Sequence, residues 1–308
     1  MKVSSLEEKM KVAILGGSGF LGKYVVEEAI NNGIEPVIFS RSSKKNDKYE
    51  CRVTDYSKED LALKLNDIEA VIHLAAKRGS QGRIDEFHAN EVLTQNLYEA
   101  CYENNIKNIV YASTISVYSD INNLPWNEEQ LVSPSLMYGV SKLACEYIGQ
   151  IYSKNKGLNI KNIRLAHLYG FNEKNNYMIN LFMRQAFNKN QLVINNKSVA
   201  KREFLYAKDA ASAIILALNK KELSGVFNVG SEERLTNYEV AKSINSIFGN
   251  SKEVFIKNHN IEETIESSYM SSEKAKNIIG FSPKYTFNQA MNEIYLLMKE
   301  LDNVPIFY

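Results

Sequence analysis

A glycine-rich stretch at residues 11–22 constrains this chain more than any other part of its sequence. Five β-prone, apolar residues run into three glycines spaced three apart, and an amphipathic helix follows. A dinucleotide site requires a strand, a glycine loop and a helix in this order. The first glycine permits a tight turn, the second lets the backbone approach a pyrophosphate, and the third lets helix and strand pack closely. The stretch therefore predicts a nucleotide-binding βα unit. Its predicted contact residues are Gly16, Ser18, Gly19, Phe20, Leu21 and Gly22.

Length and composition fit one large α/β domain with a smaller one. The 308 residues are 44% hydrophobic, which is enough for a core, and the formal net charge is only +1. This balance gives no reason to expect nucleic acid or a membrane as a partner. Cys51, Cys101 and Cys145 are never in a CxxC spacing, which favours a reducing compartment over a disulfide framework or a zinc site. Because no apolar run is long enough to span a membrane and the first residues are too polar for a signal peptide, we expect a soluble, cytoplasmic protein.

Strands and helices alternate through roughly the first 230 residues. Continuous apolar runs, such as residues 70–76, are typical of strands buried in a parallel sheet. The alternation predicts a doubly wound α/β fold with right-handed crossovers. We expect residues 10–170, with 203–230, to form the dinucleotide-binding domain. Residues 171–202 and 231–308 should form the smaller, substrate-binding domain.

Further motifs make a family resemblance specific. Besides the glycine loop, they are His73-Leu74-Ala75-Ala76, Asn90, Ser113-Thr114-Ile115-Ser116-Val117-Tyr118, Tyr138-Gly139-Val140-Ser141-Lys142 and Lys201-Arg202-Glu203-Phe204. Together they resemble the extended short-chain dehydrogenases/reductases of the nucleotide-sugar epimerase/dehydratase group. The resemblance covers residues 11 to about 298. It implies a Rossmann-type doubly wound parallel sheet with a smaller C-terminal α/β substrate domain, NAD or NADP as cofactor, and a nucleotide-diphosphate sugar as substrate.

The resemblance also implies a homodimer. We expect the helices around residues 87–104 and 136–153 to pair with their copies across a twofold axis. Apolar positions that we expect to be exposed on these helices support this. They are Leu97, Cys101, Leu143 and Ile148.

A tyrosine and a lysine four residues apart are candidates for acid–base chemistry. Such a pair lies on one helix face, where the ammonium can favour the phenolate form of the tyrosine. The spacing occurs at Tyr138/Lys142, Tyr152/Lys156 and Tyr238/Lys242. Only Tyr138 begins a helix, at about residues 135–153, that follows the fifth predicted strand (residues 109–113) and a proline-bearing loop. Tyr138 therefore returns to the carboxyl edge of the sheet. The resemblance makes Tyr138 the acid/base, while Lys142 lowers its pKa and holds the nicotinamide ribose.

Thr114 ends the fifth predicted strand, where the resemblance places a hydroxyl that hydrogen-bonds the reacting oxygen. A threonine at the end of a strand is also common without any function. Dehydratases of the group carry an Asp-Glu pair directly after this hydroxyl. Here the pair is Ile115-Ser116, which cannot supply carboxylates for eliminating water.

The choice between NAD and NADP depends on the end of the second predicted strand. An NAD site usually has an Asp or Glu about 20 residues beyond the glycines, for the ribose 2′-hydroxyl. Here Ser40 and Arg41 follow Phe39, and no carboxylate appears before Asp47. A guanidinium suits a 2′-phosphate, which favours NADP, although a basic turn that tolerates NAD is the alternative.

Other cofactor contacts follow from the resemblance. Asp55 matches the position near the adenine, and an Asp at a strand end is equally a turn former. The remaining implied cofactor contacts are Leu74, Ala75, Ala76 and Asn90.

The substrate contacts rest on the resemblance as well. Arg202 matches the arginine that clamps the nucleotide diphosphate. His167 stands where a phosphate-binding Asn is usual; a neutral histidine can donate one hydrogen bond, and a satisfied histidine in a packed turn is the alternative. The other implied substrate contacts are Lys77, Arg78, Thr114, Ser116, Tyr177, Asn180 and Asn228.

Three functions compete at this point. The first is C4 epimerisation of a UDP-hexose or UDP-N-acetylhexosamine by transient hydride transfer to a bound nicotinamide cofactor. The second is NADPH-dependent reduction of a 4-keto sugar nucleotide. The third is a non-catalytic dinucleotide-binding regulator. The joint presence of Thr114, Tyr138 and Lys142 favours an enzyme, and the overall resemblance favours the epimerase.

Overall fold

The computed structural model describes residues 9–42, 48–79, 81–173 and 177–301. Asp47 falls outside these residues. The chain divides into two compact units. Unit 1 comprises Met1–Ser113, Leu136–Ile163 and Ile214–Val226; unit 2 comprises Thr114–Ser135, Arg164–Ala213 and Phe227–Tyr308. No helix in the described part of the chain is long and apolar enough to cross a bilayer.

A seven-stranded sheet is built in the order β10-β6-β5-β4-β1-β2-β3. Its strands are β1 (Lys11–Leu15), β2 (Glu35–Ser40), β3 (Glu50–Val53), β4 (Ala70–His73), β5 (Asn108–Thr114), β6 (Asn159–Leu165) and β10 (Gly225–Val229). β1 runs parallel to both β2 and β4, and β4 runs parallel to β5. This order confirms the predicted doubly wound parallel sheet, and β3 lies at one edge of it.

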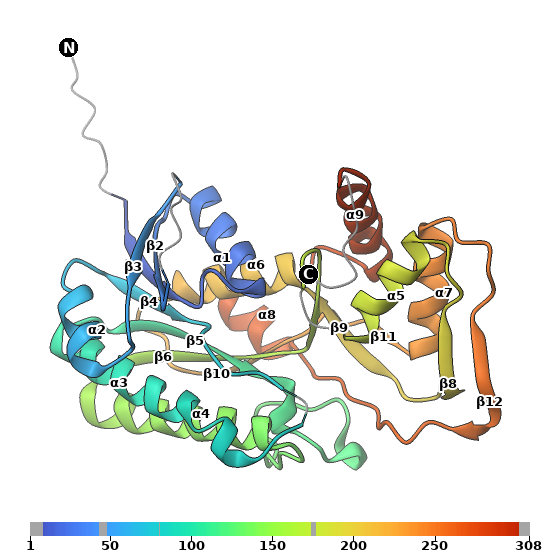
Figure 1. Ribbon diagram of the computed structural model, residues 1–308. Helices are drawn as coiled ribbons and strands as arrows, with labels where there is room; N and C mark the ends of the chain where they lie inside the picture. The colour runs from blue at the N-terminus through green and yellow to red at the C-terminus, as the bar shows by residue number, and fades with distance from the viewer. Residues whose placement is uncertain (1–8, 43–47, 80, 174–176, 302–308) are drawn as a thin grey trace. The chain divides into compact units, whose positions relative to one another are not determined.

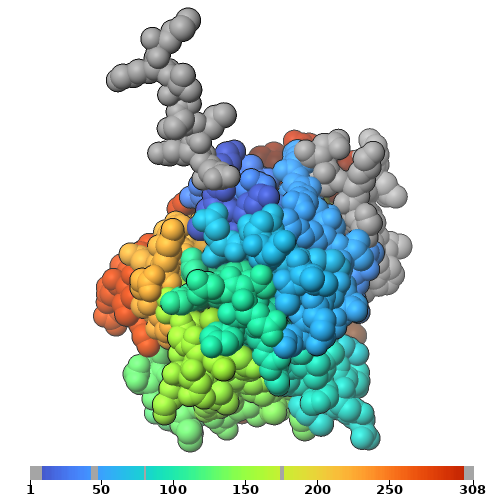
Figure 2. All heavy atoms as spheres, turned by 90° about the vertical axis from the view of Figure 1, so that its left-hand side faces the viewer, coloured from blue at the N-terminus to red at the C-terminus, as the bar shows by residue number. Residues whose placement is uncertain are grey.

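Four helices of unit 1 accompany these strands: α1 (Phe20–Asn31), α2 (Lys58–Lys64), α3 (Ala89–Glu103) and α4 (Met137–Lys156). Figure 1 shows α3 and α4 lying along one face of the sheet and α1 on the other. The C-terminal ends of α3 and α4 emerge side by side in the view of Figure 2. α4 ends at Gly157, whose positive φ of 67° suits a glycine.

The packing of α3 corrects one expectation. Leu97 and Cys101 are completely buried in the core beneath the helix, whereas Leu143 and Ile148 are half-buried. The apolar side chains that α3 and α4 do expose are Val92, Tyr102, Met137, Val140, Tyr147 and Ile151. The prediction that Leu97 and Cys101 are exposed was wrong, because α3 packs with its apolar face against α4 and the sheet.

Unit 2 contains two smaller sheets. One has the order β11-β9-β7, from Arg234–Leu235, Arg202–Tyr206 and His167–Tyr169. The other pairs β12 (Phe255–Glu262) with β8 (Val193–Lys197). The sequence did not predict these strands, because β7 and β11 are very short and β12 is exposed along most of its length, so it has no alternating apolar pattern.

The helices of unit 2 are α5 (Met178–Phe187), α7 (Asn237–Ile247), α8 (Glu273–Ile279) and α9 (Phe287–Lys299), while α6 spans Ala207–Leu218. Capping boxes start α7 and α9, with Thr236 facing Glu239 and Thr286 facing Gln289. α5, α7 and α9 bury aromatic and methionine side chains in a core of their own. The sequence-based boundaries, 10–170 with 203–230 against 171–202 with 231–308, stay a prediction.

Candidate functional site

The glycine loop between β1 and α1 is crowded by backbone. Gly16 has a φ of +82°, and a Cβ there would lie 2.8 Å from the backbone nitrogen of Ala75. A Cβ on Gly22 would lie 2.2 Å from the carbonyl oxygen of Gly16. Real side chains do not tolerate such contacts, so only glycine lets α1 approach the loop this closely.

The N-terminus of α1 is open to an anion. Its N-cap residue is Gly19, no side chain caps the helix, and its first turn has no acidic residue. The first N–H groups of a 12-residue helix and its positive dipole end are therefore available to a phosphate. A bare cradle of backbone at a helix start fits the pyrophosphate of a dinucleotide. Ser18, Phe20 and Leu21 are half-buried beside this helix start.

The turn after β2 carries the predicted cofactor selectivity. The Ser40 hydroxyl, at the strand end, donates to the carbonyl oxygen of Ser42 at 2.6 Å. Arg41 is exposed and makes no ion pair with a described residue. Asp55 accepts a hydrogen bond from the Ser57 backbone at 2.8 Å, and Ser57 in turn caps α2. The turn-forming interpretation of Asp55 is thus realised.

Asn90 ties the loop after β4 to two helices. Its side chain accepts from the Lys77 backbone nitrogen at 2.7 Å and donates to the Ser141 hydroxyl of α4 at 3.2 Å. β4 ends at His73, so Leu74, Ala75 and Ala76 continue as a loop, and Ala75 approaches Gly16. Asn90 therefore holds the loop that borders the glycine cradle.

Tyr138 and Lys142 stand one turn apart near the start of α4. Tyr138 is half-buried and packs near the Phe87 ring, with 6.0 Å between ring centroids. Lys142 is 2% exposed, and its ammonium lies 4.0 Å from the centroid of the Tyr111 ring. Burial lowers the pKa of Lys142 to about 8, partly offset by Cys145 and Glu146. The pair therefore places an ammonium group with a lowered pKa on the same helix face as a phenol.

The two other Tyr–Lys pairs lie elsewhere. The Tyr152 hydroxyl donates to Glu99 on α3 at 2.9 Å, and Lys156 lies over the Tyr102 ring at 4.5 Å. Tyr238 is 38% exposed at the start of α7. Neither pair combines a buried lysine with the end of a strand of the large sheet.

His73 ends β4 in a fully buried position. Its Nε2 lies 3.1 Å from the Thr94 hydroxyl, which donates to the Asn90 carbonyl at 2.8 Å. The Thr94 oxygen must then accept from Nε2–H. Burial, with a smaller contribution from Lys142, lowers the pKa of His73 to about 3, so the ring is neutral at physiological pH.

Thr114 and Ser116 surround a short turn after β5. The Ser116 backbone nitrogen donates to the Thr114 hydroxyl at 3.2 Å, and the two hydroxyls are also 3.2 Å apart. Thr114 is 8% exposed, while Ser116 is half-buried. Ser116 lies within the 3₁₀ helix Ile115–Val117, and the Thr114 side chain caps this helix.

A polar network supports the segment after this turn. Arg164 donates to the Tyr118 hydroxyl at 2.6 Å, and that hydroxyl lies 3.0 Å from Asn228 Oδ1. The Trp126 ring stacks on the Tyr118 ring, with 5.3 Å between the ring centroids. Asn228, which we had considered a weak substrate contact, is completely buried and belongs to this network. In the sequence, the spacing of Arg164 before Tyr169-Gly170 is the one signal that could have indicated this network.

Arg202 and His167 lie in the small sheet of unit 2. Arg202 lies 5.2 Å from the Phe204 ring centroid, and His167 pairs with Phe204 in the strand register. His167 Nε2 is 2.9 Å from the hydroxyl of Ser268, a residue that the sequence reading missed. Burial and the charge of Arg202 lower the pKa of His167 to about 3, so it stays neutral.

The other predicted substrate contacts differ in how far their side chains are exposed. Tyr177 is 42% exposed before α5, and Asn180 is buried within that helix. Lys77 is exposed and lies 3.7 Å from the Glu86 carboxylate. Arg78 is also exposed.

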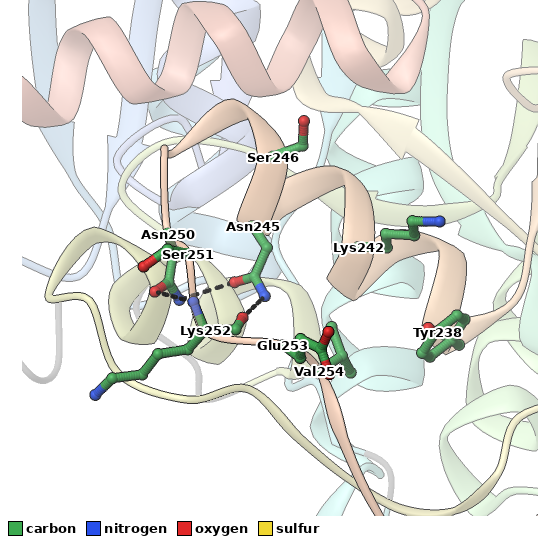
Figure 3. A pocket seen from close by; sticks show the side chains of 9 residues that line it. All are labelled: Tyr238, Lys242, Asn245, Ser246, Asn250, Ser251, Lys252, Glu253 and Val254. Carbon is green, nitrogen blue, oxygen red and sulfur yellow. Dashed lines mark hydrogen bonds between the residues drawn. The ribbon is translucent and has the colours of Figure 1, made fainter.

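A pocket of about 430 Å³ lies in unit 2, along α7 and the loop that follows it. Figure 3 shows its amide side chains turned toward one another. Asn245 donates to the Lys252 carbonyl at 2.8 Å, and Asn250 donates to Asn245 at 2.9 Å. The lining contains Tyr238 and Lys242 but none of the predicted site residues.

Comparison with known proteins decides the family. Residues 12–230 match the family model described as the NAD dependent epimerase/dehydratase family. The chain belongs to this family. In this epimerase/dehydratase chain, the matched residues include the glycine loop, Tyr138 and Lys142.

Several relatives cover nearly the whole chain. A crystal structure of UDP-N-acetylglucosamine 4-epimerase from Bacillus cereus is 61% identical, covers 97% of this chain and 100% of that one, and superimposes with a TM-score of 0.92. A Bacillus subtilis protein named as an uncharacterized UDP-glucose epimerase is 30% identical over 94% of this chain and 98% of its own length. UDP-glucose 4-epimerase from Thermus thermophilus, in complex with NAD, is 23% identical with a TM-score of 0.82, over 94% of this chain and 99% of that one. This last likeness shows the shared fold.

Proposed function

We propose that this protein is a nucleotide-sugar epimerase that inverts C4 of a UDP-hexose or UDP-N-acetylhexosamine. The observation that carries the proposal is the pairing of Tyr138 with a buried Lys142 on α4, in the unit that holds the bare glycine cradle. The 61% identity to UDP-N-acetylglucosamine 4-epimerase from Bacillus cereus supports the choice of a UDP-N-acetylhexosamine.

Each catalytic side chain has a defined task. The nicotinamide cofactor supplies, when bound, a reversible acceptor for a hydride. Tyr138 takes the proton of the C4 hydroxyl and later returns it, so that the reaction is redox-neutral. The ammonium of Lys142 favours the phenolate form of Tyr138. Thr114 donates a hydrogen bond to the C4 oxygen.

Ile115 and Ser116 separate this activity from dehydration. Elimination of water needs an acid and a base next to the reacting carbons. Ile115 is apolar and buried, and Ser116 uses its backbone nitrogen to bond Thr114. Oxidation followed by reduction is therefore the reaction that these side chains support.

We assign the diphosphate of the substrate to Arg202 and His167. A mostly buried guanidinium is a strong partner for phosphate oxygens. His167 is neutral and has Ser268 as the partner of Nε2, so His167 and Ser268 can offer hydrogen bonds beside the Arg202 cation without adding further charge. Lys77, Arg78, Tyr177 and Asn180 remain proposed supporting contacts, and residues 171–202 and 231–308 remain the proposed substrate domain.

The cofactor is a nicotinamide dinucleotide, and NAD is the form that the family description names. Arg41 is exposed at the end of β2 without an ion pair to any described residue, which favours a 2′-phosphate and hence NADP. This observation also favours the second candidate function, an NADPH-dependent 4-keto-sugar-nucleotide reductase.

One assay separates the two functions. Purified protein is incubated with UDP-N-acetylglucosamine and no added reductant, and the products are resolved by chromatography. Formation of the C4 epimer establishes the epimerase. If no UDP-, dTDP-, GDP- or CDP-hexose epimerises while a 4-keto sugar nucleotide consumes NADPH stoichiometrically, the protein is the reductase.

We also propose a homodimer built from α3 and α4. Both helices expose apolar side chains, namely Val92 and Tyr102 on α3 and Val140, Tyr147 and Ile151 on α4. Exposed apolar residues gathered on two packed helices are typical of a face that a second copy covers.

A further inference from the structure

Glu146 is a buried carboxylate that the proposed reaction does not use. It lies on α4, one helical turn beyond Lys142 and two turns beyond Tyr138, and it is completely buried. Its Oε1 accepts a short hydrogen bond from the hydroxyl of Ser113, which is 4% exposed. Ser113 belongs to β5 and directly precedes Thr114. One carboxylate thus connects the strand that ends in Thr114 with the helix that carries Tyr138 and Lys142.

The ammonium of Lys142 needs a carboxyl group that acts on it through space. It is almost entirely removed from water. Its direct contact is the face of the Tyr111 ring, 4.0 Å away. Side chains four residues apart on a helix are neighbours, so Glu146 lies close enough to act on Lys142 through space.

We propose that Glu146, held in place by Ser113, is a positioning residue that keeps Lys142 protonated and fixes the catalytic face of α4 against β5. This proposal rests on the proposed function only for its effect on turnover. The Ser113 hydroxyl prevents the buried carboxylate from turning away from the helix. Removal of the carboxyl group leaves the Lys142 ammonium with its direct contact to the face of the Tyr111 ring.

The other titratable groups around Lys142 do not replace Glu146. His73 on β4 is neutral, since burial and the lysine itself lower its pKa. Burial raises the pKa of Cys145 on α4 and of Tyr111 on β5, so both stay uncharged near neutral pH. Tyr138 is the phenol that Lys142 serves. Cys145 and Glu146 both raise the pKa of Lys142, and of the two only Glu146 carries a carboxyl group.

The test compares Glu146→Gln with Ser113→Ala. Glutamine has the same shape and can still accept the Ser113 hydrogen bond, so this variant removes the charge and keeps the connection. Ser113→Ala removes this one hydrogen bond and leaves the Glu146 carboxyl group in place. Glu99→Gln is the matched control, because Glu99 of α3 accepts a hydrogen bond from Tyr152 of α4, the helix that also carries Glu146.

The decisive measurement is NMR titration of protein labelled at the lysine ε-carbons, with the Lys142 resonance assigned through Lys142→Met. In the wild type we expect a midpoint near the pKa of about 8 that burial gives Lys142. Glu146→Gln should lower the midpoint by about one pH unit or more, Ser113→Ala by less, and Glu99→Gln should not change it. In an active epimerase, the basic limb of the kcat–pH profile should move in the same order.

An unchanged Lys142 midpoint in Glu146→Gln would overturn the proposal. If that variant does not fold, an unchanged midpoint in Ser113→Ala has the same consequence. A protein that epimerises no nucleotide sugar would refute the proposed function instead, because the Lys142 titration needs no substrate.

Discussion

Replacement of Gly22 by alanine tests the glycine cradle most directly. The added Cβ would lie 2.2 Å from the Gly16 carbonyl oxygen and 2.6 Å from the backbone of Gly17, where ordinary contacts begin near 3.4 Å. Because the obstacle is backbone, α1 or the loop must move by roughly 1 Å. Overpacking of this kind costs about 1–3 kcal/mol. For a chain of this size we expect a fall in Tm of roughly 2–10 °C.

The same movement should weaken cofactor binding. Gly16 and Gly17 belong to the turn that leads into the open N-terminus of α1, so their displacement spoils the pyrophosphate cradle. We expect the Kd for NAD to rise at least about tenfold, which corresponds to about 1.4 kcal/mol. Calorimetric titration gives this Kd, and thermal unfolding followed by circular dichroism, with and without NAD, gives both Tm values.

Gly149→Ala is the matched control within α4. A Cβ at Gly149 would lie 3.4 Å from Ile160 and 3.6 Å from Tyr98, which are ordinary contacts. Alanine also has a higher helix propensity than glycine by about 1 kcal/mol. This variant should therefore keep or slightly raise the Tm. A Gly22→Ala protein with wild-type Tm and wild-type NAD affinity would refute our account of the loop.

Three other predictions test the remaining proposals. Tyr138→Phe should lower turnover by roughly 10²–10⁴-fold while NAD binding stays the same, and a variant with near-normal turnover would remove Tyr138 from the acid–base role. Arg41→Ala should weaken NADPH binding by about 1–3 kcal/mol and leave NADH nearly unaffected; equal losses for both cofactors, or none, contradict the NADP assignment. Ile151→Glu should convert the dimer into a folded monomer by light scattering, and a wild-type monomer at micromolar concentration would count against the dimer.

Part of the candidate site follows from residues that are adjacent in sequence. The glycine loop, the strand before it and the helix after it are adjacent in sequence, so their spacing was enough to predict them. The Tyr138 helix was predicted for the same reason, from its position after β5 and a proline-bearing loop. The observed elements, β1, α1 and α4, begin and end within a few residues of the predicted ones.

Tertiary contacts decided which side chains are available. Periodicity identifies an apolar helix face but not the element that covers it, and so Leu97 and Cys101 were expected at the surface although both are completely buried. Asn90 bonds the loop after β4 and Ser141 of α4, while its contact with the cofactor stays a prediction. Such hydrogen bonds connect residues far apart in the chain and leave no trace in local spacing.

The sequence by itself determined the doubly wound sheet, the glycine cradle and the Tyr138–Lys142 pair, because each depends on residues that are neighbours along the chain. Only the tertiary structure decided the electrostatic setting of that pair. Lys142 lies in an almost completely buried position on α4, and Glu146 of the same helix is hydrogen-bonded by Ser113 of β5, 33 positions earlier. Burial and long-range hydrogen bonds change the energy of a charge, and both arise only when distant segments pack together.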